Sequence, residues 1–159
     1  MGTRHWTQSY ADIPAEIDAD RFASMVDLLD AALERHASRP AFKAFGQTLS
    51  YADVDRLSRS FASYLQNRLG VRQGDRVAVM MPNLLAFPVT LLGIMRAGAV
   101  QVNVNPLYTP RELEHQLNDA GVETIVVFNG STPTLAEVRA NTGLKTVITV
   151  GVGDASGAT

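Results

Sequence analysis

Two glycine-containing stretches of the 159-residue sequence have residue types that could bind phosphate. The first begins at Gly151 and follows an apolar run, as in dinucleotide-binding turns, where helix N-terminal N–H groups hold a pyrophosphate. Its third glycine, Gly157, comes one residue too late for the G-x-G-x-x-G spacing, which disfavours a dehydrogenase module. The second, Gly130–Thr134, has one glycine and no lysine beside it. A helix cap at Thr132 explains it better than a phosphate loop does.

Other site chemistries are disfavoured by composition. The chain has no cysteine, so disulfides and thiolate metal sites are excluded. Its histidines, His5, His36 and His115, lack the spacing of a metal site, and we expect no metal ligands. A formal net charge of -2 without clustered Lys and Arg gives no basis for nucleic-acid binding.

A third group of candidates consists of turn residues that follow apolar runs. Pro82 and Asn83 follow the run that ends at residue 81, and Asn105, Pro106 and Tyr108 follow the run that ends at residue 104. Open α/β sheets bind ligands at the carboxyl ends of their strands, so these five residues are predicted to border a substrate pocket. The alternative, that they only shape turns, stays open.

The elements that would position these turns alternate along the chain. Apolar runs predict strands over 77–81, 100–104, 124–128 and 146–150, and helical periodicity predicts helices over 24–39, 50–68, 84–97, 110–120 and 133–141. A small hairpin is predicted around Gly46. Short strand–helix–strand connections indicate an α/β fold with a mainly parallel sheet and crossover helices on both faces.

Several helix ends carry local signals. Thr109, Pro110 and Glu112 are typical of an N-cap, a first helical residue and the third member of a capping box, a cap that contributes about 1 kcal/mol. Gly98 is predicted to close the preceding helix. Asn83 is predicted to begin that helix, where Pro88 would cause either a kink or a later start.

The stretch between Arg76 and Arg96 carries no charge and is long enough to suggest a transmembrane helix. Pro82 and Pro88 interrupt it. A buried strand followed by a buried helix is therefore the interpretation we favour.

Three stretches resemble core motifs of adenylate-forming enzymes, the superfamily of acyl-CoA synthetases, luciferases and peptide-synthetase adenylation domains. Leu49 and Tyr51 belong to L-S-Y-A-D-V, which is similar to the first motif, L-[ST]-Y-x-[ED]-L. The other two are G-D-R-V with M-P-N, and I-M-R-A-G-A with N-V-N-P-L-Y. The long run N-P-L-Y-T-P-R-E-L-E-H-Q-L-N-D is most similar to bacterial long-chain-fatty-acid–CoA ligases.

The resemblance implies a two-step activity that uses ATP, Mg²⁺ and CoA. A fatty acid would react with ATP to give acyl-AMP, and CoA would then displace AMP. The phosphate loop, the metal ligands and the C-terminal domain of the family have no counterpart here, so the chain resembles an inactive N-terminal fragment without catalytic residues or tightly bound cofactors. A ligase for medium-chain or aryl acids is an alternative parent, and a non-catalytic interaction module is an alternative of another class.

The predicted organisation is an N-terminal arm at 1–21, the first part of an AMP-binding domain at 22–150, and a flexible tail at 151–159. Trp6 and Tyr10 are predicted to pin the arm to the domain. No apolar leader is present, so we expect a cytoplasmic protein, with peripheral contact to the inner membrane face suggested by its substrate. The expected partners in the parent are the fatty acid, ATP, CoA, the missing remainder of the enzyme and a second copy as homodimer.

Overall fold

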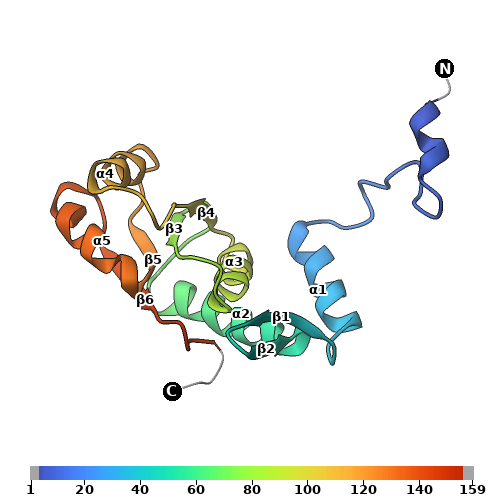
Figure 1. Cartoon of the computed structure of the whole chain (residues 1–159), viewed down its shortest axis with the longest axis horizontal. Coiled ribbons are helices and arrows are strands. Elements are labelled where there is room, and N and C mark those ends of the chain that lie inside the picture. Colours follow the sequence, from blue (N-terminus) through green and yellow to red (C-terminus); the bar gives the residue numbers. More distant parts are fainter. Residues whose placement is uncertain (1–3, 156–159) are drawn as a thin grey trace.

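The computed structural model describes residues 4–155, and Figure 1 shows how their elements are arranged. Residues 1–3 and 156–159, including Gly157 of the glycine-containing turn, lie outside the described part. The strands are β1 (Pro40–Ala44), β2 (Gln47–Ser50), β3 (Arg76–Met80), β4 (Val100–Asn103), β5 (Thr124–Phe128) and β6 (Thr146–Val150). The α-helices are α1 (Met25–Arg35), α2 (Tyr51–Asn67), α3 (Ala86–Arg96), α4 (Pro110–Asp119) and α5 (Thr132–Val138). Short 3₁₀-helices are η1 (His5–Ser9), η2 (Asn129–Ser131) and η3 (Arg139–Asn141).

Four strands form a parallel sheet in the order β4-β3-β5-β6. In the register, Val79 of β3 lies opposite Asn103 of β4 on one side and Val126 of β5 on the other. The predicted parallel sheet is therefore confirmed. The predicted hairpin is also confirmed, since β1 and β2 pair antiparallel in a separate two-stranded sheet.

Helices cover both faces of the parallel sheet, as predicted. Val77 and Val79 pack in the cluster that contains residues of α2 and α3, whereas Ala78 and Met80 pack against residues of α4 and α5. Figure 1 shows these two helix pairs on opposite sides of the strands. The alternation follows from the two-residue period of a strand. Full burial of each Val or Met side chain contributes about 1.5–3 kcal/mol, so β3 anchors both halves of the core.

A third layer consists of α1 and the β1–β2 hairpin. Leu33 of α1 and Leu49 of β2 pack in one buried cluster with Leu92 of α3. The hairpin turns at Phe45 and Gly46, whose φ angles are +49° and +76°. Positive φ at both central positions is the geometry of a type I′ turn, which favours Asn or Gly at the first position. Phe at this position costs about 1 kcal/mol or more in backbone strain.

Helices α2 and α3 approach closely at Gly93. A Cβ atom there would lie 2.6 Å from the Phe61 ring and 3.2 Å from the carbonyl oxygen of Ser58. The contact leaves no room for a side chain at position 93 of α3, and only glycine has none.

Local capping groups fix several helix ends, among them the predicted one at Gly98. Ser24 accepts a hydrogen bond from the Asp27 N–H at 3.1 Å, and Ser50 forms a complete capping box with Asp53. Hydrogen bonds from Ser50 lower the pKa of Asp53, which fits a carboxylate at the positive end of a helix. Gly98 closes α3 with a φ of +75°.

The predicted cap at Asn83 is wrong. Helix α3 begins at Ala86, its N-cap is Leu85, and no side chain caps it. The chain first makes a turn in which the Leu84 N–H donates to the carbonyl of Pro82 at 2.8 Å. The later start places Pro88 at the third helical position, where the missing N–H costs no intrahelical bond.

The predicted helix over 133–141 is divided. α5 ends at Val138 and continues as η3. Thr132 does not cap it, because its hydroxyl donates to the carbonyl of Asn129 at 2.7 Å and the helix already includes Thr132.

The N-terminal arm does not pack as predicted. Trp6 is half exposed and its ring contacts His5, and Figure 1 shows the η1 segment projecting away from the sheet and its helices. Within residues 4–155, no helix is long and apolar enough to cross a membrane. The uncharged stretch between Arg76 and Arg96 forms β3 and α3, as expected.

Strand β4 lies at one edge of the sheet. A side chain reaches this edge from the neighbouring helix: Nε2 of Gln116 in α4 donates to the carbonyl oxygen of Asn103 at 2.9 Å. The amide of Gln101 donates to the Asn103 side chain at 2.7 Å. The Gln116 side chain thus engages a backbone carbonyl at the edge that a further strand would otherwise pair with.

Gly93→Val is expected to lower the free energy of unfolding by about 2 kcal/mol, because the added atoms overpack the α2–α3 contact. Urea unfolding followed by circular dichroism measures the change. Gly143→Ala is the matched control, since the nearest atom to its Cβ would lie at 3.9 Å. Equal stabilities for the two variants would contradict the close-contact explanation.

Candidate functional site

The carboxyl edge of the sheet brings together two of the predicted turns. Pro82 and Asn83 follow β3, and Asn105 and Pro106 follow β4. Because β3 and β4 are parallel neighbours, both turns lie at the same edge. Pro82, Asn83 and Asn105 are exposed. The structure therefore places these residues together, and their contact with a substrate stays a prediction.

The turn after β4 is built by a dense set of local hydrogen bonds. The Asn105 side chain accepts from the Leu107 N–H at 3.0 Å, and the Asn105 carbonyl accepts from the Tyr108 N–H at 3.1 Å. Thr109 and Glu112 then form the predicted capping box. The N–H and hydroxyl of Thr109 donate to Glu112, and these bonds lower the pKa of its carboxyl.

Tyr108 differs from the exposed residues of these turns because its side chain packs inside the domain. Its side chain is partly buried and packs against the cluster that joins the sheet to α4 and α5. The predicted site residues therefore divide into an exposed group at the edge and a tyrosine that supports the turn from behind.

Ser131 connects neighbouring turns at this edge and was missed as a supporting residue. It is buried, and its hydroxyl donates to the carbonyl of Pro106 at 3.4 Å. The bond joins the turn after β5 to the turn after β4. Because the two residues are 25 positions apart, no local pattern could have indicated this contact.

In the part of the chain that the structure describes, neither glycine-containing stretch has the geometry of a phosphate loop. A Cβ at Gly130 would lie 2.4 Å from the Phe128 ring, so this glycine allows a side chain to pack. The N–H of Gly151 already donates to the Asp154 carboxylate at 2.7 Å. The helix-start interpretation of the second stretch, Gly130–Thr134, agrees with its position at the beginning of α5, although its cap differs.

An apolar groove opens beside Asn83. The groove has a volume of about 440 Å³ and lies between α1, β1 and the beginning of α3. Its lining includes Leu29, Phe42, Lys43, Asn83, Phe87 and Leu91. We call it the hairpin groove. The sequence patterns did not indicate it, because its walls come from three separate elements.

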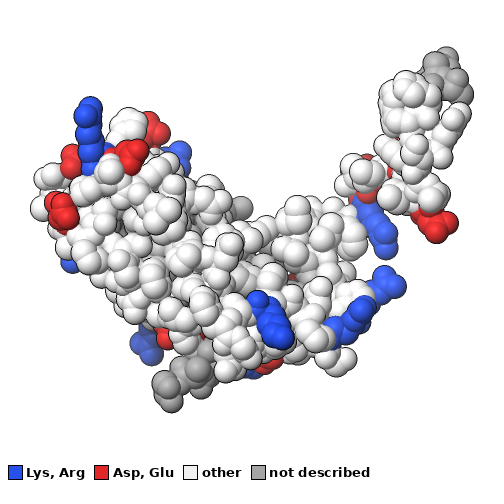
Figure 2. Space-filling model, viewed as in Figure 1, with Lys and Arg blue, Asp and Glu red and all other residues white. Residues whose placement is uncertain are grey.

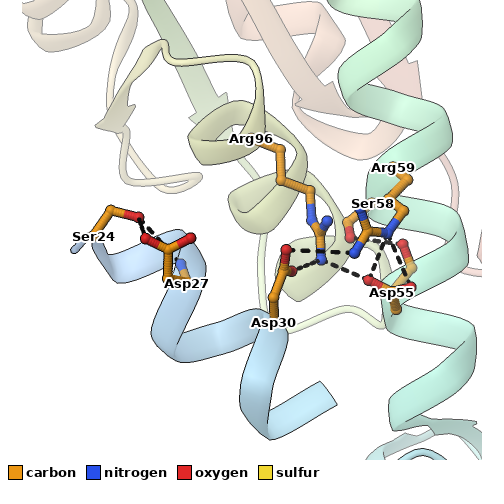
Figure 3. Close-up of polar contacts among 7 residues, drawn as sticks. All are labelled: Ser24, Asp27, Asp30, Asp55, Ser58, Arg59 and Arg96. Atoms are coloured by element: carbon orange, nitrogen blue, oxygen red, sulfur yellow. Dashed lines mark hydrogen bonds and ion pairs between the residues drawn. The ribbon is translucent and has the colours of Figure 1, made fainter. Parts of the chain in front are cut away.

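A buried arginine holds α1, α2 and α3 together (Figure 3). Arg96 of α3 donates to Asp30 of α1 at 2.5 Å and to Asp55 of α2 at 2.7 Å. Arg59 donates to the same two carboxylates at 3.4 and 2.9 Å. The Arg96 side chain is 8% exposed, while the two carboxylates are about one third exposed.

The charges of this cluster are balanced, which indicates a structural role. Partial burial raises the pKa of Asp55, but the hydrogen bond and charge of Arg59 and the charge of Arg96 outweigh it and leave this pKa lowered. Helical periodicity faces Asp30, Asp55 and Arg59 toward solvent. The Arg59 side chain is indeed 56% exposed, but those of Asp30 and Asp55 are only about one third exposed because they lie in this cluster. Among residues 4–155, no group of three or more acidic, His or Cys side chains could hold a metal ion.

Thr109→Ala is expected to lower the free energy of unfolding by about 1 kcal/mol, because it removes the cap of α4. Chemical unfolding provides the measurement. Arg111→Ala, in the same helical turn, is the control and should change stability by less than about 0.5 kcal/mol. In the Thr109→Ala background, Glu112→Ala should lower the free energy of unfolding by less than it does in the wild-type chain, because the two residues share one capping box. If the two losses simply add, a shared capping box is contradicted.

Asp55→Asn is expected to destabilise the fold by about 1–2 kcal/mol at pH 7, a value reduced from that of buried ion pairs because the carboxylate is partly solvated. Because the pKa of Asp55 is lowered in the folded chain, its ionised carboxylate stabilises the fold at pH values above the ordinary aspartate pKa of about 3.9. This contribution to stability is lost as the pH falls through the folded pKa. The difference from wild type should therefore shrink below about pH 4. Unfolding curves across this range measure it, with Glu137→Gln as control. A constant difference from neutral to acid pH would refute the ionic contribution.

Comparisons with known proteins agree with this architecture. The AMP-binding enzyme family matches residues 29–158. Curated long-chain-fatty-acid–CoA ligases of Salmonella typhimurium and Escherichia coli O157:H7 are 51% and 50% identical to the chain over 150 residues. Each alignment covers 94% of this chain and 27% of the relative. The chain thus spans about a quarter of the length of these relatives.

Solved structures give the same result. A long-chain-fatty-acid–CoA ligase of Archaeoglobus fulgidus superposes with a TM-score of 0.74 at 31% identity, over 80% of this chain and 27% of that one. An anthranilate CoA ligase in complex with anthranoyl-AMP superposes with a TM-score of 0.77 at 24% identity, over 81% of this chain and 25% of that one, which shows the fold alone. On the family match over most of its length and the shared parallel sheet, the chain belongs to the AMP-binding enzyme family.

Proposed function

We propose that this chain is the N-terminal part of a ligase that activates long-chain fatty acids with ATP and CoA through an acyl-AMP intermediate. The observation that carries the proposal is the 50–51% identity, over 94% of the chain, to ligases named for long-chain fatty acids. The parallel sheet and its carboxyl-edge turns have the layout in which open α/β folds bind ligands.

In this proposal the chain supplies a scaffold. Pro82, Asn83, Asn105 and Pro106 border the substrate pocket at the edge of the sheet, and Tyr108 supports their turns. Residues 4–155 contain no cluster suited to a metal ion, so the residues present do not fit the Mg²⁺ site of the reaction. We assign no catalytic residue to this chain, and ATP, Mg²⁺ and CoA would be held by other parts of the longer protein.

Two other functions follow from specific observations. A ligase for aryl acids is the second candidate, because a 4-coumarate–CoA ligase of Oryza sativa is 42% identical over 83 residues. The lower coverage, 52% of the chain, makes it the weaker one. A non-catalytic interaction module would fit the exposed apolar side chains, such as Leu107 and Phe45.

The proposed setting is the cytoplasm, with peripheral contact to the inner membrane face where long-chain fatty acids partition. A homodimer of the longer protein is part of the same proposal. The peripheral contact follows from the proposed substrate, which is largely hydrocarbon.

A chimera tests the function. We expect the isolated chain to show no oleate-dependent pyrophosphate exchange, because residues 4–155 contain no cluster of side chains suited to a metal ion. Placed in the Escherichia coli relative instead of the 150 matching residues, the chain should support oleate-dependent exchange within about tenfold of the parent. The relative lacking that stretch is the negative control.

Three outcomes would contradict the proposal in different ways. Exchange by the isolated chain would refute the scaffold role. A folded chimera that activates 4-coumarate and not oleate would support the aryl-acid alternative. A folded chimera inactive with both acids would favour the interaction module.

A further inference from the structure

Residues 4–20 form an arm before α1 whose polar contacts are all internal. Every hydrogen bond and ion pair that they make within the described part of the chain joins two arm residues, such as Arg4 and Glu16 at 2.8 Å. None of the buried clusters found in residues 4–155 includes an arm residue. Figure 1 and Figure 2 show the arm as a projection from the domain. Contacts with the domain therefore do not fix its position.

The second half of the arm combines aliphatic and acidic side chains. Residues 11–20, which we call the acidic segment, are all exposed, and Ile13 and Ile17 have 68% and 89% of their surface in solvent. Removing these two side chains from water is favourable. The segment has no Lys or Arg, and its carboxylates are Asp12, Glu16, Asp18 and Asp20. It therefore suits a partner surface that is apolar and carries positive charge.

The hairpin groove has both properties. Its volume of about 440 Å³ is enclosed mostly by aliphatic and aromatic side chains, and Lys43 is the one charged residue among the described residues that line it. Lys43 forms no ion pair within residues 4–155. Phe42, also in the lining, keeps 44% of its surface exposed. The groove thus offers apolar surface and one cation to a partner.

The groove lies within reach of the acidic segment. Ile17 is eight residues before Met25, the first residue of α1, and eight extended residues span up to about 28 Å. Leu29, which lines the groove, is only about 6 Å further along the helix axis. A tether this short gives an effective concentration on the order of mM, which favours docking within one chain over docking between two copies.

We infer that the acidic segment docks in the hairpin groove of its own chain, with Ile17 in the apolar recess and Asp18 facing Lys43. Asp18 adjoins Ile17 and, unlike Glu16, has no ion-pair partner in the described part of the chain. The projecting arm in Figure 1 is then the open position. Burial of isoleucine favours docking and ordering of the tether opposes it, so the two positions exchange.

Disulfide trapping in the isolated chain tests the inference. The chain has no cysteine, so Ile17→Cys with Phe42→Cys introduces one possible intramolecular disulfide. Under mild oxidation we expect it to form at least about tenfold faster than in the control, Ile17→Cys with Glu137→Cys. Residue 137 is exposed on α5, at the other face of the sheet. Mass spectrometry of the digested, unreduced chain quantifies both disulfides.

Charge reversal gives a second measurement. Asp18→Lys should slow formation of the disulfide between positions 17 and 42 about threefold or more at low salt, because it places a cation opposite Lys43. Adding Lys43→Asp to the same chain should restore the rate, since the pair then has opposite charges again.

Equal rates for the two cysteine pairs, or an unchanged rate with Asp18→Lys, would overturn the inference. Disulfide-linked dimers whose yield rises with protein concentration would overturn docking within one chain and assign the groove to the arm of a second copy. Circular dichroism checks that each variant is folded, and Lys43→Cys, in the same lining, replaces Phe42→Cys if that variant unfolds. Because neither measurement involves ligase activity, this inference and the proposed function can fail separately.

Discussion

The fold depends on the complete burial of β3. Val77, Ala78 and Met80 are fully buried, and Val79 almost so, so this strand requires a strand on each edge and helices on each face. The chain meets the requirement with short crossovers, which place the ends of successive strands at one edge. The turn after β4 is abrupt for this reason: the chain must leave the sheet and begin α4 within a few residues.

Fold class followed from sequence because its signals are local and redundant. Thr109 caps α4 where the pattern predicted, and the alternation of apolar runs and helices reproduced the sheet. Asn83 failed as a cap because a turn and Pro88 shift the start of α3. Cap preference is a weak guide where a proline restricts the first helical turn.

The candidate site could be predicted only in part. Strand ends are readable, so the turns of Asn83 and Asn105 could be placed at one edge before the structure was known. The contacts that fix those turns, such as Ser131 with Pro106, join segments distant in sequence. The Arg96 cluster was missed for a related reason, because periodicity assigns a charged helical position to solvent unless a partner on another helix is known.

The amide of Gln116 on the Asn103 carbonyl has a consequence for solubility. An unprotected edge of a parallel sheet is a template for adding strands from other molecules, the first step of ordered aggregation. An incoming strand would first have to break the hydrogen bond between the Gln116 amide and the Asn103 carbonyl. Only then could its own backbone N–H donate to that carbonyl. A single glutamine on a neighbouring helix thus raises the barrier to edge-to-edge growth without lengthening the sheet.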